Sequence, residues 1–311
     1  MKTMQKILSA LGLIFVGVLL SHTVRSESIP DLTVIDNGPK SVIARTKAVE
    51  VPKEIDFAGE TVPVNDVDVY ERLDRELIIN TYLHSSTILN FKRANKYFPV
   101  IEPILKEYGV PDDFKYLAVI ESNLQNVTSS AGAKGIWQFM QVTAKQYGLE
   151  VNSSVDERYH LEKSTIAACK YLIDAKSKFG SWTLAAASYN AGLAGINSKL
   201  TNQEVTDYYN LLLNSETSRY LFRIIALKQI MQNPEKYGFD FLPEDFYQYT
   251  PNHKIEIDSS INNLTKFATE QGINLRILKR HNPWLLVNSL VNNARKKYEI
   301  EIPENGFYVL N

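Results

Sequence analysis

The chain has 311 residues, a formal net charge of -1 and 44% hydrophobic residues. This length and apolar content suffice for one large hydrophobic core and a smaller second module, and they exclude an intrinsically disordered chain. Because neither sign of charge dominates, the composition also argues against a nucleic-acid-binding protein, which needs a basic surface to contact phosphates.

The first 26 residues have the pattern of a secretory signal peptide. Lys2 and Lys6 precede an apolar run over residues 7–20, and residues 21–26 are more polar. The run is short for a membrane-spanning helix. We therefore expect export with cleavage near Ser26; the alternative is an uncleaved segment that anchors the protein to the membrane.

Cys169 is the single cysteine of the chain, so an intrachain disulfide is excluded. It lies in an apolar run over residues 166–169, which favours a buried structural thiol. An exported chain without disulfides suits the bacterial periplasm or cell envelope, where its stability would come from its core.

Residues 27–66 contain several prolines and short polar stretches, and we interpret them as a linker or loosely docked N-terminal arm. Residues 67–108 are rich in helix formers and carry apolar residues at helical spacing. Gly109 ends this region. Because the helical spacing starts at residue 67, the folded helical domain is expected to begin there.

Pro111 begins the next predicted helix, because proline is tolerated in a first helical turn. Phe114, Leu117 and Ala118 form its apolar stripe, and Glu121 occupies the next position on that stripe. A carboxylate on an apolar helix face is costly when ionised, so burial raises its pKa toward the range that a general acid needs. The alternative is that a nearby lysine or arginine neutralises Glu121.

The segment after this helix is small and polar and predicts a loop over residues 122–135. No aspartate or glutamate occurs from Ser122 to Leu149, so the segment offers no second carboxylate of the kind that two-carboxylate glycosidases use. Its neutral hydrogen-bonding side chains suit an uncharged sugar polymer. Trp137 and Phe139 add rings that either stack on sugar faces or pack in the core.

Further helices follow the loop. Ser164 is expected to cap a helix that ends at Gly180, and Ser181 to cap a second helix that ends near Gly192. A longer helix is expected over residues 205–232. No segment before the tail alternates convincingly like a strand, so the main domain is predicted to be α-helical.

The tail has a different pattern. Residues 254–257 and 298–303 alternate like short strands, and residues 261–270 and 275–280 between them have helical spacing. The sequence therefore predicts a mainly α protein, with a helical domain followed by a small β-α-α-β module over residues 252–303.

Three motifs in the helical region, taken in order and spacing, resemble the transglycosylase domain shared by soluble and membrane-bound type D lytic transglycosylases. They are Glu121-Ser122-Asn123-Leu124, Gly132-Ala133-Lys134-Gly135-Ile136-Trp137-Gln138 and Ala187-Ser188-Tyr189-Asn190-Ala191-Gly192. Residues 97–99 and 113–120 resemble the type D branch. The resemblance covers about residues 67–235.

The resemblance implies a lysozyme-like helical fold and a carbon–oxygen lyase that cleaves the β-1,4 bond between N-acetylmuramic acid and N-acetylglucosamine in peptidoglycan. It implies that Glu121 is the catalytic acid and that Ser129, Gln138, Tyr189 and Asn190 bind substrate. It also implies that the Tyr189 hydroxyl holds the catalytic carboxyl. No metal or organic cofactor is implied, and the histidines show no ligand spacing.

The substrate-binding serine is ambiguous, because the loop is one residue shorter than the family pattern. Counting back from the glycine–alanine pair selects Ser129, and counting forward from Glu121 selects Ser130. We prefer Ser129, because a deletion is absorbed more easily just after a helix. Glu216 and Tyr220 match a further Glu-Thr-x-x-Tyr pattern of the family near the cleft.

The implied mechanism uses one residue twice. Glu121 would protonate the glycosidic oxygen and then, as a base, assist the 6-hydroxyl of the muramic acid to close a 1,6-anhydro ring. Without a second carboxylate nearby, the substrate's own acetamido oxygen would stabilise the positive charge at the anomeric carbon. The alternative hypotheses are that the protein is a hydrolytic muramidase or that it is a non-catalytic scaffold that binds murein strands.

The tail resembles a degenerate LysM module, a small β-α-α-β unit that binds N-acetylglucosamine chains. Matching features include Leu264, the segment 282–285 and the segment 300–303, whereas the usual glycine–aspartate pair is missing and Asp258 alone lies near its place. The module is therefore expected either to bind glycan or to stabilise the enzyme by docking. The expected organisation is a signal peptide over 1–26, an arm over 27–66, a transglycosylase domain over 67–240 and a LysM-like module over 252–303.

Overall fold

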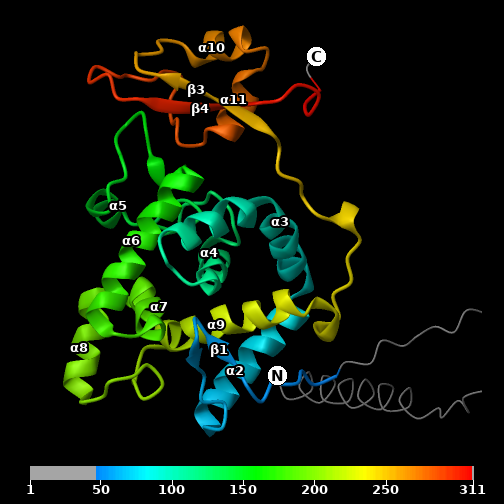
Figure 1. The fold of residues 1–311 in the computed structure, drawn as a ribbon, viewed down its shortest axis with the longest axis vertical. Coiled ribbons are helices and arrows are strands. Elements are labelled where there is room, and N and C mark those ends of the chain that lie inside the picture. Colours follow the sequence, from blue (N-terminus) through cyan, green and yellow to red (C-terminus); the bar gives the residue numbers. More distant parts are fainter. Residues whose placement is uncertain (1–46, 310–311) are drawn as a thin grey trace, which may run out of the picture. The chain divides into compact units, whose positions relative to one another are not determined.

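The computed structural model describes residues 47–309. The expected signal peptide and the first part of the expected arm, up to residue 46, lie outside the described residues. The described part contains a helical domain, coloured cyan to yellow in Figure 1, and a small module of two strands and two helices, coloured orange to red. This arrangement confirms the predicted fold class.

The helical domain is built from eight α-helices within the described residues. They are α2 (Val67–Tyr82), α3 (His84–Glu107), α4 (Lys115–Ser122), α5 (Gln141–Gln146), α6 (Leu161–Phe179), α7 (Trp182–Ala191), α8 (Leu193–Gln203) and α9 (Ser215–Gln232). Helix α9 packs against α2, α4 and α7, and α6 packs against α3 and α7. Within residues 47–309, no helix combines the length and the apolar character that a membrane span requires.

Local signals set several helix ends. Asp66 caps α2 by accepting a hydrogen bond from the Val69 N–H at 3.0 Å. Ser181 caps α7, and Gly180 ends α6 in the left-handed conformation, as the sequence predicts. The expectation that Ser164 begins a helix is wrong, because α6 starts at Leu161 and the Ser164 hydroxyl donates back to a carbonyl within its first turn.

The expected long helix over residues 205–232 is also wrong at its start. Helix α9 begins at Ser215, where the Asn214 side chain accepts from the Thr217 N–H at 2.9 Å. Residues 205–214 are not helical, because Asp207 accepts hydrogen bonds from the following backbone N–H groups and forms a turn.

The second half of the expected arm is part of the folded domain. Strands β1 (Asp56–Phe57) and β2 (Glu60–Thr61) form a short antiparallel hairpin. Phe57 is 0% exposed and its ring meets that of Phe114 edge-on at 5.3 Å. Val51 and Val62 are also buried, so a loosely docked arm does not describe residues 51–62.

This hairpin also supports helix α7 through Glu60. Its carboxylate accepts from the Trp182 N–H at 2.6 Å, from the Thr183 N–H at 2.9 Å and from the hydroxyl groups of Ser181 and Thr183. Burial alone would raise the pKa of Glu60, but these hydrogen bonds lower it to about 2. An ionised carboxylate therefore sits at the positive end of α7.

The small module has the predicted β-α-α-β order. Strand β3 (Asn252–Ile257) pairs antiparallel with β4 (Tyr298–Pro303), and α10 (Leu264–Glu270) and α11 (Leu275–His281) lie between them in sequence. Its core contains Leu264, Ile277, Leu278 and Ile300, together with Val155 from the helical domain, which is 1% exposed. The module therefore completes its core with a side chain from outside itself.

The segment between α11 and β4 docks on the helical domain. The Asp156 N–H donates to the Trp284 carbonyl and the Leu286 N–H to the Ser154 carbonyl, both at 2.9 Å. The Trp284 ring stacks on the rings of His160 and Tyr298. These contacts support the docking interpretation of the module.

Candidate active site

The candidate catalytic residue lies near the end of the short helix α4. Residues 116–120 of this helix are buried, and the left-handed Asn123 ends it just after Glu121. Burial raises the pKa of Glu121 to about 7, whereas a hydrogen bond from Tyr220 and the charge of Arg223 act to lower it. The carboxyl is therefore protonated in a large fraction of molecules at neutral pH.

Tyr220 is the direct hydrogen-bond partner of the Glu121 carboxyl. Its hydroxyl donates to Oε1 of Glu121 from the buried face of α9. Within residues 47–309, Glu121 forms no ion pair with a lysine or arginine, and the Arg223 guanidinium donates instead to the Ile120 carbonyl at 3.3 Å. The alternative that Glu121 is neutralised by a paired cation is therefore not what the structure shows.

The loop after α4 is fastened to the rest of the domain at both ends. The buried Ser122 hydroxyl donates to the Ile136 carbonyl at 2.7 Å, which joins the end of α4 to the middle of the loop. The buried Arg158 guanidinium donates to the carbonyls of Gly132 and Phe139, each at 3.2 Å, and pairs with Asp156. Side chains from outside the loop therefore bind three of its backbone carbonyls, those of Gly132, Ile136 and Phe139.

Gly135 is required where this loop crosses the segment that carries Arg158. Its φ is +83°, and a Cβ added there would lie 1.9 Å from the Arg158 carbonyl oxygen. By contrast, Gly132 also has a positive φ but leaves open space around a Cβ. The close backbone approach explains the second glycine of the motif.

The two residues of the loop that are predicted to bind substrate, Gln138 and Ser129, form hydrogen bonds within the loop. The Gln138 amide donates to the Gly135 carbonyl at 2.6 Å and to the Val127 carbonyl at 3.2 Å. The Ser129 hydroxyl accepts from the Ala133 N–H at 3.0 Å. Both side chains therefore order the loop, whereas Ser130 is exposed.

The aromatic side chains of the loop belong to the core. Trp137 is fully buried, and its indole N–H donates to the Thr165 hydroxyl at 2.8 Å. Phe139 is also buried. The idea that these rings stack on sugar faces is therefore wrong, and their core-packing alternative is correct.

The Tyr189 hydroxyl does not contact the Glu121 carboxyl, although the resemblance implies that it would. Its hydroxyl donates to the Trp137 carbonyl at 2.9 Å, and its ring packs edge-on against Tyr171 and Phe139. Tyr220 takes the expected role. The Glu-Thr-x-x-Tyr pattern was the sequence signal for this residue, because it places Tyr220 one helical turn after Glu216.

Asn190 links its helix to the start of α9. Its amide donates to the Glu216 carboxylate at 3.1 Å and accepts from the Thr217 hydroxyl at 2.8 Å. The charge of Glu216 also acts to raise the pKa of Glu121. Helix α9 thus supplies a second carboxylate within electrostatic reach of Glu121, whereas the sequence offers none in the loop that follows α4.

A pocket of about 360 Å³ brings together three of the five expected site residues, Gln138, Tyr189 and Asn190. Met140, Tyr147 and Leu193 are among its other lining residues. Glu121 and Ser129 do not line this pocket. Among the described residues, no group of three or more His, Cys, Asp or Glu is arranged to hold a metal ion.

Two buried titratable groups lie outside this site, and the structure confirms the predicted burial of one of them, Cys169. Cys169 is a free, fully buried thiol, and burial raises its pKa to about 12. His160 is buried beside Trp284, and burial lowers its pKa to about 3.

Comparisons with known proteins agree with this geometry. Residues 98–212 match the family of transglycosylase SLT domains, and residues 253–306 match the soluble lytic transglycosylase C-terminal LysM-like domain. Membrane-bound lytic murein transglycosylase D from Escherichia coli (strain K12) is 30% identical over 227 residues, which cover 71% of this chain and 48% of that protein. The same protein from Escherichia coli O6:H1 (strain CFT073) gives the same values.

A more distant relative is a tributyltin chloride resistance protein described in Alteromonas sp. (strain M-1). It is 26% identical over 123 residues, which cover 39% of this chain and 59% of that protein. The chain spans about half the length of the murein transglycosylases that it matches. The chain therefore carries a transglycosylase SLT domain followed by a LysM-like domain of the kind found at the C-terminus of soluble lytic transglycosylases.

Proposed function

We propose that this protein is an exported peptidoglycan lytic transglycosylase of the bacterial periplasm or cell envelope. It would cleave the β-1,4 bond between N-acetylmuramic acid and N-acetylglucosamine and leave 1,6-anhydromuramic ends. Its substrate would be the glycan strands of peptidoglycan, with no nucleic acid as partner. The SLT domain and the similarity to murein transglycosylase D support the class of reaction.

The observation that supports this proposal most directly is the raised pKa of Glu121. A carboxyl with a pKa of about 7 is available as a proton donor at neutral pH and becomes a competent base once it has given up its proton. The Tyr220 hydroxyl fixes one of its oxygens, so the other oxygen is left to face the scissile bond.

The reaction would proceed in two proton transfers. Glu121 donates its proton to the glycosidic oxygen as the bond from that oxygen to the muramic acid anomeric carbon breaks, and the N-acetylglucosamine end leaves as an alcohol. The 6-hydroxyl oxygen of the same muramic acid then bonds to the anomeric carbon. Its proton passes to the Glu121 carboxylate, which restores the starting state.

The remaining expected residues would position the sugar. Gln138, Tyr189 and Asn190 line one pocket, and we assign them to substrate contact together with Ser129 at the nearby loop. Their hydrogen bonds to loop and helix backbone keep the pocket in one shape, which favours the transition-state geometry over a looser ground state.

Hydrolysis is the second candidate function, because Glu216 supplies a carboxylate near Glu121. In a hydrolase of the inverting type, Glu216 would activate a water molecule. Its hydrogen bond from Asn190 favours instead a role in holding α7 against α9. The two functions differ in their products.

The test is mass spectrometry of the soluble fragments released from purified murein by the wild type, Glu121→Gln and Glu216→Gln. We expect anhydromuramyl products from the wild type and from Glu216→Gln, and none from Glu121→Gln. Reducing muramic acid ends that disappear in Glu216→Gln would identify a hydrolase. A folded wild type that binds murein but releases nothing would identify a non-catalytic scaffold.

A further inference from the structure

A second cleft lies beside the helix that carries Glu121, and we call it the cationic cleft. Its volume is about 620 Å³, and its lining includes Arg93, Lys96, Tyr97, Asn126, Tyr247 and Arg280. It is separate from the pocket of Gln138, Tyr189 and Asn190, with which it shares no lining residue. Neither the fold nor the proposed reaction accounts for it.

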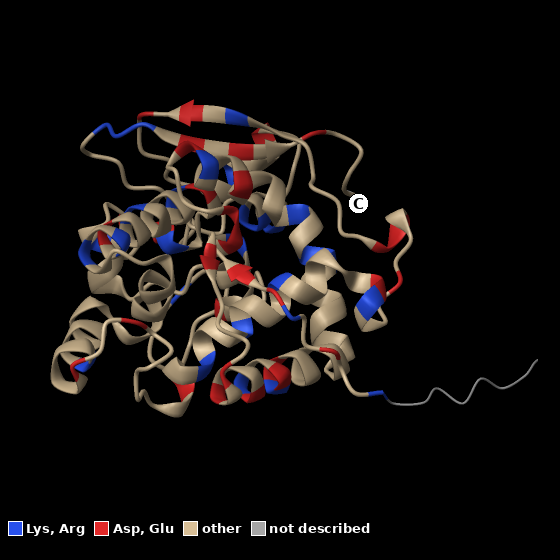
Figure 2. Ribbon diagram, turned by 60° about the horizontal axis from the view of Figure 1, so that its bottom comes forward, with Lys and Arg blue, Asp and Glu red and all other residues tan. Residues whose placement is uncertain are grey.

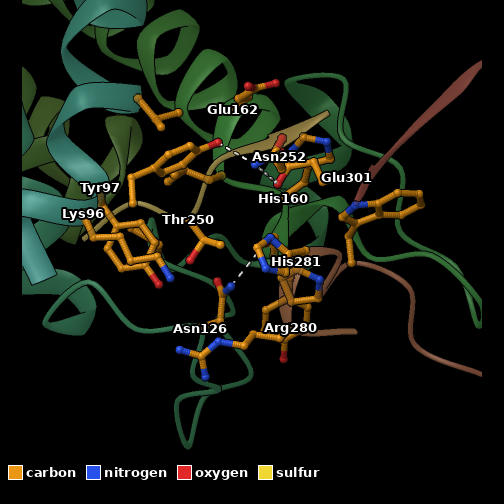
Figure 3. Close-up of a pocket in the computed structure, with 17 residues that line it drawn as sticks. Lys96, Tyr97, Asn126, His160, Glu162, Thr250, Asn252, Arg280, His281 and Glu301 are labelled. Atoms are coloured by element: carbon orange, nitrogen blue, oxygen red, sulfur yellow. Dashed lines mark hydrogen bonds between the residues drawn. The ribbon is translucent and has the colours of Figure 1, made fainter. Parts of the chain in front are cut away.

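Four parts of the chain build the cationic cleft. Arg93, Lys96 and Tyr97 lie on one face of α3, because residues three and four apart on a helix are neighbours. Asn126 comes from the loop after α4, and Arg280 from helix α11 of the LysM-like module. Figure 3 draws the adjoining pocket, which shares Lys96, Tyr97, Asn126, Thr250 and Arg280 with the cleft; its other lining residues include Glu162 and Glu301.

The fourth wall is the connection between the two domains, which is fixed in place. The Tyr247 N–H donates to the Lys92 carbonyl at 3.2 Å, and the Asn95 amide donates to the Tyr247 carbonyl at 3.1 Å. The segment that connects the two domains is therefore hydrogen-bonded to α3 at Tyr247.

The charge in this cleft is one-sided. Its lining holds three basic residues and no aspartate or glutamate, whereas Figure 2 shows basic and acidic residues interspersed along most elements. Within residues 47–309, Arg93, Lys96 and Arg280 form no ion pair, and the Arg93 guanidinium donates only to the Asn123 carbonyl at 3.1 Å. Burial and the positive charge of Arg280 lower the pKa of Lys96, whereas the charge of Glu301, which is not among the lining residues of the cleft, acts to raise it. Lys96 and Arg280 therefore repel each other across the cleft.

An anion would relieve this repulsion, and its nature follows from the other groups of the cleft. Arginine guanidinium groups bind carboxylates through paired hydrogen bonds. The amides of Gln125, Asn126 and Gln248 match the backbone groups of a peptide. The contact of Arg93 with Asn123, two residues after Glu121 in the chain, places the cleft beside the catalytic helix.

We propose that the cationic cleft binds the carboxylate groups of the peptide stems that extend from the glycan strand. This inference rests on the proposed function, because a strand held at Glu121 would present its stems to neighbouring clefts. The LysM-like module would then contribute to substrate recognition through Arg280. The segment between its helix α11 and strand β4 instead contacts the helical domain.

The first experiment compares two substrates that differ only in their peptides. Soluble glycan strands with stems, and the same strands after enzymatic removal of the stems, are given to the wild type and to the double variant Arg93→Gln/Arg280→Gln. We expect the double variant to have a KM at least about tenfold higher for the strands with stems, with kcat and the KM for peptide-free strands unchanged. An equal loss on both substrates, or no change on either, would overturn the proposal.

The control is Arg276→Gln, which removes an exposed arginine from the same helix, α11, outside the cleft. It should leave KM unchanged for both substrates. A rise in KM as large as that of the double variant would point to general electrostatic attraction and would overturn the proposal. A binding measurement in the Glu121→Gln background separates this proposal from the proposed function. Preferential binding of stem-bearing strands that is lost in the double variant supports the cleft even if no anhydro product is ever formed.

Discussion

At the scale of single residues, the proposed function makes the pairing of Glu121 with Tyr220 the feature that should set the pH range of activity. If Glu121 is the proton donor, its carboxyl must be protonated to act, so kcat/KM should fall as the pH rises through about 7. Tyr220→Phe removes a hydrogen bond that stabilises the carboxylate, and the pKa should move up by about one to two pH units. The measurement is a pH profile of product release.

Tyr189→Phe is the matched control for this profile. Its hydroxyl binds the Trp137 carbonyl and not Glu121, so its loss should lower stability or rate without moving the alkaline limb upward. Equal upward shifts in both variants would contradict the assignment of Tyr220 as the direct partner.

The raised pKa of Glu121 also has a cost in stability. Below the ordinary value of 4.5 both the folded and unfolded states are protonated, so Glu121 contributes nothing. Between 4.5 and about 7 the unfolded state ionises first, and above 7 the full penalty of up to about 3 kcal/mol is present. Glu121→Gln should therefore unfold at higher denaturant concentration than the wild type at pH 8, with the gap closing at pH 4. A gap that is the same at both pH values would contradict this account.

The sequence predicts those features of the site that depend on residues close together in the chain, and it does not predict those that depend on packing between distant helices. The place of Glu121 on a buried stripe follows from helical spacing alone, and its raised pKa follows from burial. The exchange of roles between Tyr189 and Tyr220 does not, because both are buried tyrosines near the carboxyl and only the packing of α9 against α4 selects between them. The burial of Trp137 likewise depends on Thr165 of a distant helix.

At the scale of elements, the loop between α4 and α5 depends on one close backbone crossing. Gly135→Ala would place a methyl group 1.9 Å from the Arg158 carbonyl oxygen at a φ of +83°. We expect a loss of at least about 3 kcal/mol in the free energy of unfolding, with activity lost in parallel. Chemical denaturation followed by circular dichroism measures this change.

Gly132→Ala provides the comparison for this loop. Its φ is +86°, but no atom lies within 4 Å of the added Cβ, so the cost should be about 1–2 kcal/mol. If both substitutions cost the same, left-handed backbone strain alone would explain the glycines and the crossing with Arg158 would be unimportant.

Element boundaries were predictable where a local cap sets them and not where tertiary contacts do. Ser181 and Gly180 mark ends that need only nearby backbone groups. Residues 205–214 carry buried aromatic and apolar side chains, such as Tyr208, that imitate helical spacing. They pack into the core as a turn because Asp207 and Asn214 bind the backbone on either side.

At the scale of the whole molecule, the core of the LysM-like module includes a buried side chain of the helical domain, so the two domains should unfold together. Val155 belongs to the helical domain but is buried in the core of the LysM-like module. Val155→Ala should lower the free energy of unfolding by about 2 kcal/mol and shift one cooperative calorimetric transition to lower temperature. The exposed Val142 gives a control, since Val142→Ala should leave Tm unchanged. Two separate transitions, of which only one moves, would contradict a shared core.

The hydrogen bonds of Glu60 bear on how this catalytic unit can be transplanted between proteins. A fragment cut at residue 67, or at residue 98 where the family match begins, would keep Glu121, Gln138, Tyr189 and Tyr220. It would lose the carboxylate that binds the backbone N–H groups of Trp182 and Thr183 at the start of the helix carrying Tyr189. A gene fusion that reuses this helical unit should therefore include the β1–β2 hairpin that precedes its helices. A fusion without the hairpin would keep the side chains of the candidate site but lose the hydrogen bonds that Glu60 makes to the start of α7.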